Sequence, residues 1–238
     1  MNFIGTLLRN MERSSAGSEE TAKKVMELCG EISPKNALFV GDDFFTPLMM
    51  KQVCGGLIAA YTEDFRAAQA AEKGLDSRAV QLFELPEEQS GFDFIWYNGS
   101  VEFDGVTQRL SALKERAGNG IVVYRALCWL IEPMPDTRLY YERRFGIIEQ
   151  MYTVVYKAKE LGFALRDFYI APKSDWREGY YKPLNAAAQK YGSAHPESGD
   201  ITAGLNLLNK ETDMFESHGE EFSYIYFILE NRSEGTQC

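Results

Sequence analysis

Short apolar runs alternate with amphipathic stretches along most of the chain. The runs at 36–41 (NALFVG) and 92–97 (FDFIWY) are nearly continuous in apolar residues, which is typical of strands buried on both faces of a parallel sheet. The intervening stretches start at capping residues and stop near glycines, as helices do. The pattern predicts strands at 36–41, 57–61, 79–83, 92–97, 120–125, 163–170 and 222–229, and helices at 18–30, 46–55, 64–73, 105–117, 147–161, up to 191, and 203–217.

This alternation predicts the fold class. Strands that alternate with helices form a doubly wound α/β sheet with right-handed crossovers, and the last two strands can pair antiparallel at one edge. We therefore expect a Rossmann-like, seven-stranded, mostly parallel sheet with an antiparallel C-terminal edge and helices on both faces. We expect one domain over 1–238, with an N-terminal extension (1–17), aromatic lid insertions (about 131–146 and 171–192) and a flexible tail (233–238).

The sheet also predicts where a ligand binds. Ligands of open α/β sheets lie beyond the carboxyl ends of the strands, where the strand order reverses. The candidate site is therefore formed by the loops that follow Gly41, Tyr61, Phe83 and Tyr97.

Charge and cysteine content narrow the partners. The 238 residues contain 25 Lys and Arg against 35 Asp and Glu, a net charge of −10, which opposes nucleic acid because its binding depends on basic side chains. The four cysteines form no CxxC pair, and no apolar run is long enough to span a membrane. We expect a cytoplasmic protein with a small-molecule substrate, no metal, no membrane or nucleic-acid partner, and a possible homodimer.

Three blocks of sequence carry a family resemblance. They are Gly17-Ser18-Glu19-Glu20-Thr21, the block of Leu85-Pro86 with 92–96 and Gly99, and the late block of 159–163, Trp176 and 180–184. In this order and spacing they resemble the class I S-adenosylmethionine-dependent methyltransferases, specifically the small bacterial proteins related to the ubiquinone-biosynthesis and type 11 group. The resemblance covers about residues 15–232. It implies S-adenosylmethionine as cofactor and a small molecule as methyl acceptor.

The chain departs from this family at the turn after the first strand. The family has an acidic residue and then a GxGxG turn, whereas only Gly41 is kept here. Asp43 and Phe45 replace the second and third glycines, and Phe39 replaces the acid. Asp42 and Asp43 also add negative charge where the methionine carboxylate of the cofactor would meet backbone N–H groups. These departures predict an altered cofactor pose, or weakened or lost binding.

A second departure lies at the end of the second strand. The family has an acidic residue there that binds the ribose hydroxyls, and Tyr61 is its counterpart. Glu63 could replace it, or Glu63 and Asp64 could cap the next helix. The cofactor contacts that the resemblance implies are Gly41, Asp42, Asp43, Tyr61, Glu63, Glu84, Leu85, Tyr97 and Asn98.

Aromatic residues supply the candidate substrate pocket, and packing of the core and lid is the alternative explanation for each of them. Tyr97 and Glu102 are candidate general bases, although no histidine lies in this region to support the assignment, since His195 and His218 lie in polar segments elsewhere. The candidate pocket walls are Trp96, Trp129, Tyr140, Tyr141, Trp176, Tyr180 and Tyr181.

Three functions remain open. The first is an S-adenosylmethionine-dependent methyltransferase-like protein with an altered cofactor turn. The second is a non-catalytic descendant of the same fold that binds a ligand or a protein. The third, a nicotinamide-dependent oxidoreductase, is disfavoured because the GxGxxG turn for a pyrophosphate is also missing.

Overall fold

The computed structural model describes residues 3–9, 11, 13–80, 90–99, 105–195 and 198–231. Within them an eight-stranded sheet has the order β3-β2-β1-β4-β5-β8-β7, and the short β6 pairs with the end of β5. Strands β1 to β5 are parallel to one another, while β8 is antiparallel to both β5 and β7. The strands are β1 (Asn36–Val40), β2 (Gly56–Tyr61), β3 (Ser77–Ala79), β4 (Phe92–Tyr97), β5 (Ala117–Trp129), β6 (Glu149–Gln150), β7 (Phe163–Ile170) and β8 (Phe222–Asn231).

The helices divide between the sheet and a separate layer. Helices α2, α3 and α4 pack on one face of the sheet, and α5 and α7 pack on the other. The helices are α1 (Phe3–Leu8), α2 (Glu19–Leu28), α3 (Phe45–Met50), α4 (Asp64–Glu72), α5 (Val106–Arg116), α6 (Pro135–Phe145), α7 (Met151–Glu160), α8 (Lys173–Trp176), the π-helix η2 (Arg177–Tyr181), α9 (Lys182–Ala194) and α10 (Gly199–His218).

The predicted fold class is confirmed, with differences in individual elements. Strand β6 lies inside the segment expected to be a helix over 147–161, because these two residues extend the sheet beside the end of the long β5. Strand β3 starts at Ser77, two residues before the predicted strand at 79–83, most of which lies outside the described residues. Strand β5 is longer at both ends than the predicted 120–125, because Ala117 pairs with Phe92 of β4 and residues 121–129 pair with residues 222–230 of β8.

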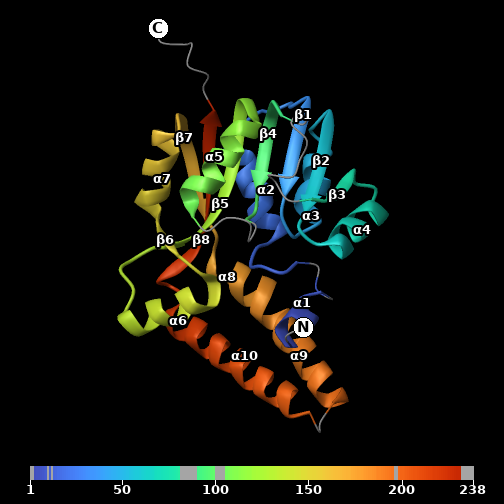
Figure 1. The fold of residues 1–238 in the computed structure, drawn as a ribbon, viewed down its shortest axis with the longest axis vertical. Coiled ribbons are helices and arrows are strands. Elements are labelled where there is room, and N and C mark those ends of the chain that lie inside the picture. Colours follow the sequence, from blue (N-terminus) through green and yellow to red (C-terminus); the bar gives the residue numbers. More distant parts are fainter. Residues whose placement is uncertain are drawn as a thin grey trace.

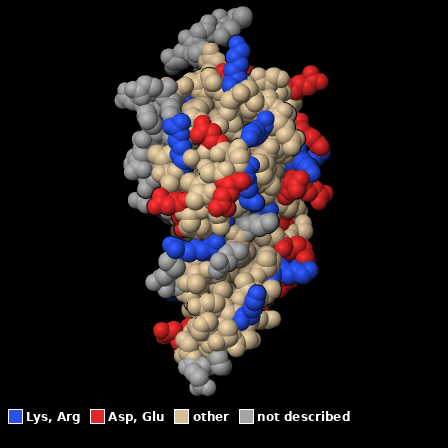
Figure 2. Space-filling view, turned by 90° about the vertical axis from the view of Figure 1, so that its right-hand side faces the viewer, with Lys and Arg blue, Asp and Glu red and all other residues tan. Residues whose placement is uncertain are grey.

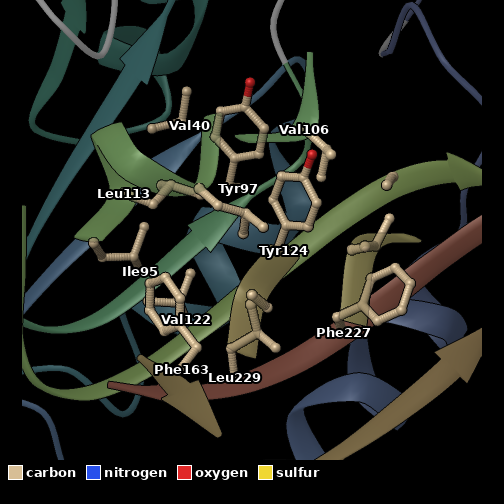
Figure 3. Packing of buried hydrophobic residues seen from close by; sticks show 14 of the residues in the cluster. Val40, Ile95, Tyr97, Val106, Leu113, Val122, Tyr124, Phe163, Phe227 and Leu229 are labelled. Atoms are coloured by element: carbon tan, nitrogen blue, oxygen red, sulfur yellow. The ribbon is translucent and has the colours of Figure 1, made fainter. Parts of the chain in front are cut away.

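Alternation of side chains along the central strands builds two apolar layers. On the face covered by α5 and α7, Leu38, Ile95 and Val122 pack against Leu110 and Leu113 and are fully buried, and Figure 3 shows this packing around Ile95 and Val122. The residues between them point to the layer under α2, α3 and α4. Burial on both faces explains why these strands are continuously apolar in sequence.

A helical layer covers the carboxyl ends of the parallel strands. Figure 1 shows α1, α6, α9 and α10 below the sheet, while β8, which runs antiparallel, ends at the opposite, upper edge. The core of this layer is aromatic. Trp176 lies at its centre, stacked on Tyr224 at a ring distance of 5.1 Å and edge-on to Phe222 at 5.3 Å.

The surface carries mixed charge. Figure 2 shows Lys and Arg interspersed with Asp and Glu over one face, with no broad area of a single sign among the coloured residues. Among the described helices, none combines the length and apolar character that crossing a bilayer requires.

Candidate functional site

The turn after β1 is crowded, and glycine is the residue that fits at its start. A Cβ atom on Gly41 would lie 2.7 Å from Cζ of Phe39 and 2.8 Å from Cβ of Asn98, closer than carbon atoms pack. The backbone of the turn therefore lies directly against the end of β4. This close approach explains why Gly41 is the glycine of the family pattern that this chain retains.

The buried Asp43 side chain links the turn after β1 to Asn98, the residue that follows β4. Oδ1 of Asp43 accepts a hydrogen bond from the Thr46 backbone N–H at 2.8 Å, and Oδ2 accepts one from Nδ2 of Asn98 at 2.6 Å. Burial, together with the neighbouring charge of Asp42, raises the pKa of Asp43 to about 6. The helix predicted at 46–55 starts one residue earlier, at Phe45, and ends at Met50. The Asp43 carboxylate accepts a hydrogen bond from the Thr46 N–H in the first turn of this helix.

Asn98 joins this carboxylate to the rest of the sheet edge. Its Oδ1 accepts a hydrogen bond from the Trp96 indole N–H at 2.7 Å, and its backbone N–H donates to the Val40 carbonyl at 2.8 Å. Its own carbonyl accepts a hydrogen bond from the Arg125 guanidinium. Both ends of the amide are thus engaged, and the orientation of Asn98 is fixed by its partners.

Asp42 points the other way, towards the N-terminal segment. Its Oδ2 accepts hydrogen bonds from the Ser14 backbone N–H at 3.0 Å and the Ser14 hydroxyl at 2.8 Å, and its Oδ1 accepts one from the Ser15 hydroxyl at 3.2 Å. The Arg125 guanidinium lies 3.9 Å from the same carboxylate. Burial disfavours the charged form, but Arg125 and the serines outweigh it and hold the pKa of Asp42 below its usual value. The pKa values of these two adjacent carboxyl groups are thus shifted in opposite directions, that of Asp42 downwards and that of Asp43 upwards.

We define residues 3–17 as the N-terminal strap, of which 10 and 12 are not described. Figure 1 shows the chain passing from α1 in the helical layer to α2 beside the sheet. Arg66 on α4 donates to the carbonyls of Met11 (2.7 Å) and Leu8 (2.9 Å), and Arg125 donates to the Ala16 carbonyl at 3.2 Å. The guanidinium of Arg13 lies over the Phe45 ring at 4.3 Å. The strap is therefore bound to α4, to β5 and to the turn after β1 by contacts from Leu8 to Ala16.

The end of β2 provides a phenol in place of a carboxylate. Tyr61 is buried, and its hydroxyl donates a hydrogen bond to the Asp43 carbonyl at 3.1 Å, while burial raises its pKa. Glu63 occupies the N-cap position of α4, yet its side chain makes no capping hydrogen bond and is exposed. The predicted capping position of Glu63 and Asp64 is confirmed, since Glu63 is the N-cap and Asp64 lies in the first turn, but the Glu63 side chain makes no capping hydrogen bond and its carboxylate remains accessible beside the strand ends.

The phenylalanines of the turn pack against neighbouring side chains, and Phe44 does so at the end of β2. Phe44 is buried in the layer under α4, 5.9 Å from the Tyr61 ring and 5.5 Å from the Arg66 guanidinium. Phe45 is half-buried beneath Arg13. Both rings thus contact other side chains and occupy space that a glycine at the same position would leave empty.

Of the four predicted residues that remain, the structure describes only Tyr97. Tyr97 is fully buried and stacks on Tyr124 with ring centroids 5.6 Å apart, and Figure 3 shows the two hydroxyls pointing to the same side of the cluster. Glu84, Leu85 and Glu102 lie outside the described residues. Their roles, and that of Tyr97 as a base, stay predictions.

The predicted pocket aromatics form packed core in two places. Trp96 belongs to the sheet layer, whereas the others belong to the helical layer. Most are almost completely buried by neighbouring rings, while Tyr140 is half-buried; packing therefore accounts for their positions, and a role in substrate binding stays a prediction. The helical-layer set is Trp129, Tyr140, Tyr141, Trp176, Tyr180 and Tyr181.

Sequence reasoning missed the basic residues of this site. Arg125 and Arg66 are buried, and each joins the sheet or its helices to the N-terminal strap. A signal existed for Arg125, because it interrupts the apolar run of β5 and a buried arginine needs partners. Within the described residues no group of three His, Cys, Asp or Glu side chains could hold a metal ion.

No protein-family model and no curated protein matches the chain. Solved structures do match in fold. S-adenosylmethionine-dependent methyltransferases from Thiobacillus denitrificans (TM-score 0.77, 12% identity) and Geobacter sulfurreducens (0.76, 13%), both in complex with S-adenosylhomocysteine, each match over 98% of this chain and 99% of their own. YjhP from E. coli matches with a TM-score of 0.75 and 14% identity, over 96% and 99%. The chain therefore has the class I methyltransferase fold over nearly its whole length.

Proposed function

We propose that the protein is an S-adenosylmethionine-dependent methyltransferase that acts on a small molecule. The observation that carries the proposal is the extent of the shared fold. It includes the sheet and the aromatic helical layer over its carboxyl ends, and two of the matching proteins hold S-adenosylhomocysteine. A fold of this kind encloses a small ligand between the strand ends and the helical layer.

Part of the site suits the cofactor. Gly41 brings the backbone of the turn close to the strand ends, and the exposed Glu63 carboxylate lies two residues after β2. Glu63 would accept hydrogen bonds from the ribose hydroxyls in place of Tyr61, whose hydroxyl is a donor already used within the turn. S-adenosylmethionine carries a net positive charge, so the acidic turn and Glu63 favour it electrostatically.

Another part does not suit the pose usual in this family. The Asp43 side chain replaces a glycine, and its carboxylate takes the N–H of Thr46 that would otherwise be free. The charge of Asp42 is adjacent, so the methionine carboxylate of the cofactor meets repulsion at this turn. We infer that the cofactor's carboxylate lies away from the turn.

The chain itself would contribute alignment and exclusion of water. Methyl transfer to a small acceptor requires the donor and acceptor to be held in line in a dry site. The N-terminal strap, bound by Asp42, Arg66 and Arg125, and the buried aromatic layer are the elements that shield the strand ends from solvent.

Calorimetric titration with S-adenosylmethionine and S-adenosylhomocysteine tests the proposal. We expect micromolar binding of S-adenosylmethionine and weaker binding of S-adenosylhomocysteine, which lacks the sulfonium charge. Glu63→Gln should weaken both, whereas Glu72→Gln, at the other end of α4, is the matched control. Absence of binding of either compound at millimolar concentration contradicts the proposal.

A specific observation favours a second candidate, a non-catalytic binding module of the same fold. The polar groups at the strand ends, Asp42, Asp43, Asn98 and Tyr61, are already engaged with one another or with the N-terminal strap. If wild type fails to bind the cofactor and the double variant Asp43→Gly, Phe45→Gly binds it, these side chains are the obstacle and the second candidate holds.

A further inference from the structure

A cavity lies between the first turn of α2 and the segment formed by α8 and η2. Its volume is about 640 Å³, large enough for a small metabolite. Its lining combines one basic side chain, Arg13 of the strap, with the acidic side chains Glu20, Asp175 and Glu178. The charges of the cavity are therefore mixed, with an acidic excess.

Asp175 is the buried acid of this cavity. The residue is only 2% exposed, and its Oδ2 has no hydrogen-bond partner in the part of the chain that the structure describes. Burial raises the pKa of Asp175, against the opposing effects of Ser18, Thr21 and the nearby Arg13. A buried carboxylate oxygen without a donor is costly, and an ammonium group would supply the missing donor together with a compensating charge.

Among the residues described, Arg13 has a buried hydrogen-bond donor without an acceptor, the reverse of the situation at Asp175. Its Nη1 is buried and has no hydrogen-bond partner within the described ranges, while its guanidinium lies 4.3 Å from the centre of the Phe45 ring. Gly17 keeps this place open, because a Cβ atom there would lie 3.1 Å from Nη1 of Arg13. A cation and an anion thus share one cavity without a hydrogen bond to each other at these two atoms. The complementary ligand carries both charges.

We propose that this cavity binds a small zwitterion, with its ammonium group on Asp175 and its carboxylate on Arg13. Glu20 and Glu178 at the rim add attraction for the ammonium end. This cavity adjoins the turn after β1 where Arg13 lies over the Phe45 ring, but the inference does not depend on cofactor binding. Such a ligand has two possible sources, the methyl acceptor itself or an effector that is not transformed.

A series of ω-amino acids tests the site on unmodified protein. Glycine, β-alanine, 4-aminobutanoate and 6-aminohexanoate differ only in the distance between ammonium and carboxylate, so the best binder measures the span between Asp175 and Arg13. Propylamine and butanoate each lack one charge and should bind at least about tenfold more weakly than the best zwitterion. Failure of every zwitterion to bind, or equal binding of the single-charge compounds, overturns the proposal.

Variants locate the binding. Asp175→Asn and Arg13→Gln should each weaken the best zwitterion by about tenfold or more. Glu72→Gln, which removes one carboxylate charge from an exposed position outside the cavity, should leave the affinity unchanged. Unchanged affinity in both Asp175→Asn and Arg13→Gln overturns the assignment. Adding S-adenosylmethionine and analysing the zwitterion by mass spectrometry separates the sources. A methylated product identifies an acceptor, and recovery of the unchanged compound from protein that binds S-adenosylmethionine in the titration above identifies an effector.

Discussion

The buried carboxylate of Asp43 should make the protein less stable as the pH rises through the weakly acidic range. Its pKa is raised from 3.8 to about 6 in the folded chain, chiefly by burial. Between these values the folded state binds more protons than the unfolded state, so the free energy of unfolding falls with increasing pH. Asp43→Asn removes the titrating group and should remove this part of the pH dependence.

The size of the effect follows from the two pKa values. One pKa unit corresponds to about 1.4 kcal/mol, so the full effect is about 3 kcal/mol, of which about 2 kcal/mol falls between pH 4.5 and 7.5. The asparagine keeps an acceptor for the Thr46 N–H. It also places an amide donor opposite Nδ2 of Asn98, which costs about 1–3 kcal/mol at every pH. The change with pH is therefore the informative quantity, because this second cost cancels from it.

Urea unfolding of wild type and Asp43→Asn at pH 4.5 and pH 7.5 provides the measurement. We expect wild type to lose about 2 kcal/mol more than the variant between the two pH values. Asp93→Asn is the matched control, because this half-buried carboxylate accepts hydrogen bonds from backbone N–H groups at 3.0 and 3.2 Å at the opposite end of the strands. Parallel profiles for wild type and Asp43→Asn would show that burial does not perturb Asp43.

Three further changes in stability follow from the packing, each measured by urea unfolding at pH 7.5. Gly41→Ala should cost about 1–3 kcal/mol because its Cβ would meet the Phe39 ring, whereas Gly199→Ala, which meets nothing within 4 Å, should cost far less; equal costs would refute the crowding. Tyr61→Phe should cost about 1 kcal/mol, since it leaves a buried carbonyl without its donor, and an unchanged stability contradicts this role. Tyr141→Phe should leave the free energy of unfolding unchanged or raise it by up to about 1 kcal/mol, because the buried Tyr141 hydroxyl has no partner among the described residues. A decrease of more than about 1 kcal/mol contradicts that reasoning.

The strand and helix order could be predicted because local pattern determines it. Strand β7 has the predicted bounds. Ser18, the first residue of the helix predicted at 18–30, caps α2 by accepting a hydrogen bond from the Thr21 N–H. The predicted antiparallel edge also holds, since β8 pairs antiparallel with β5 and β7. Strand β6 was missed because two residues carry no periodicity, and it is the end of the long β5 that selects them.

The interior of the site could not be predicted, because its contacts join distant parts of the chain. Asp43 and Asn98 are 55 residues apart, and the serines that bind Asp42 precede it by 27 and 28 residues. The sequence placed Asp42 and Asp43 together as one patch of negative charge. Tertiary contacts instead give them separate partners and pKa values on opposite sides of the ordinary value.

Equilibrium binding of S-adenosylmethionine to the wild-type protein, followed by calorimetry at neutral pH, is the most direct test of the proposed function. The fold, the exposed Glu63 and the acidic turn predict saturable binding at one site per chain, with S-adenosylmethionine bound more tightly than S-adenosylhomocysteine. No binding of either compound at millimolar concentration would contradict the proposed methyltransferase activity and leave the non-catalytic module as the function of this fold.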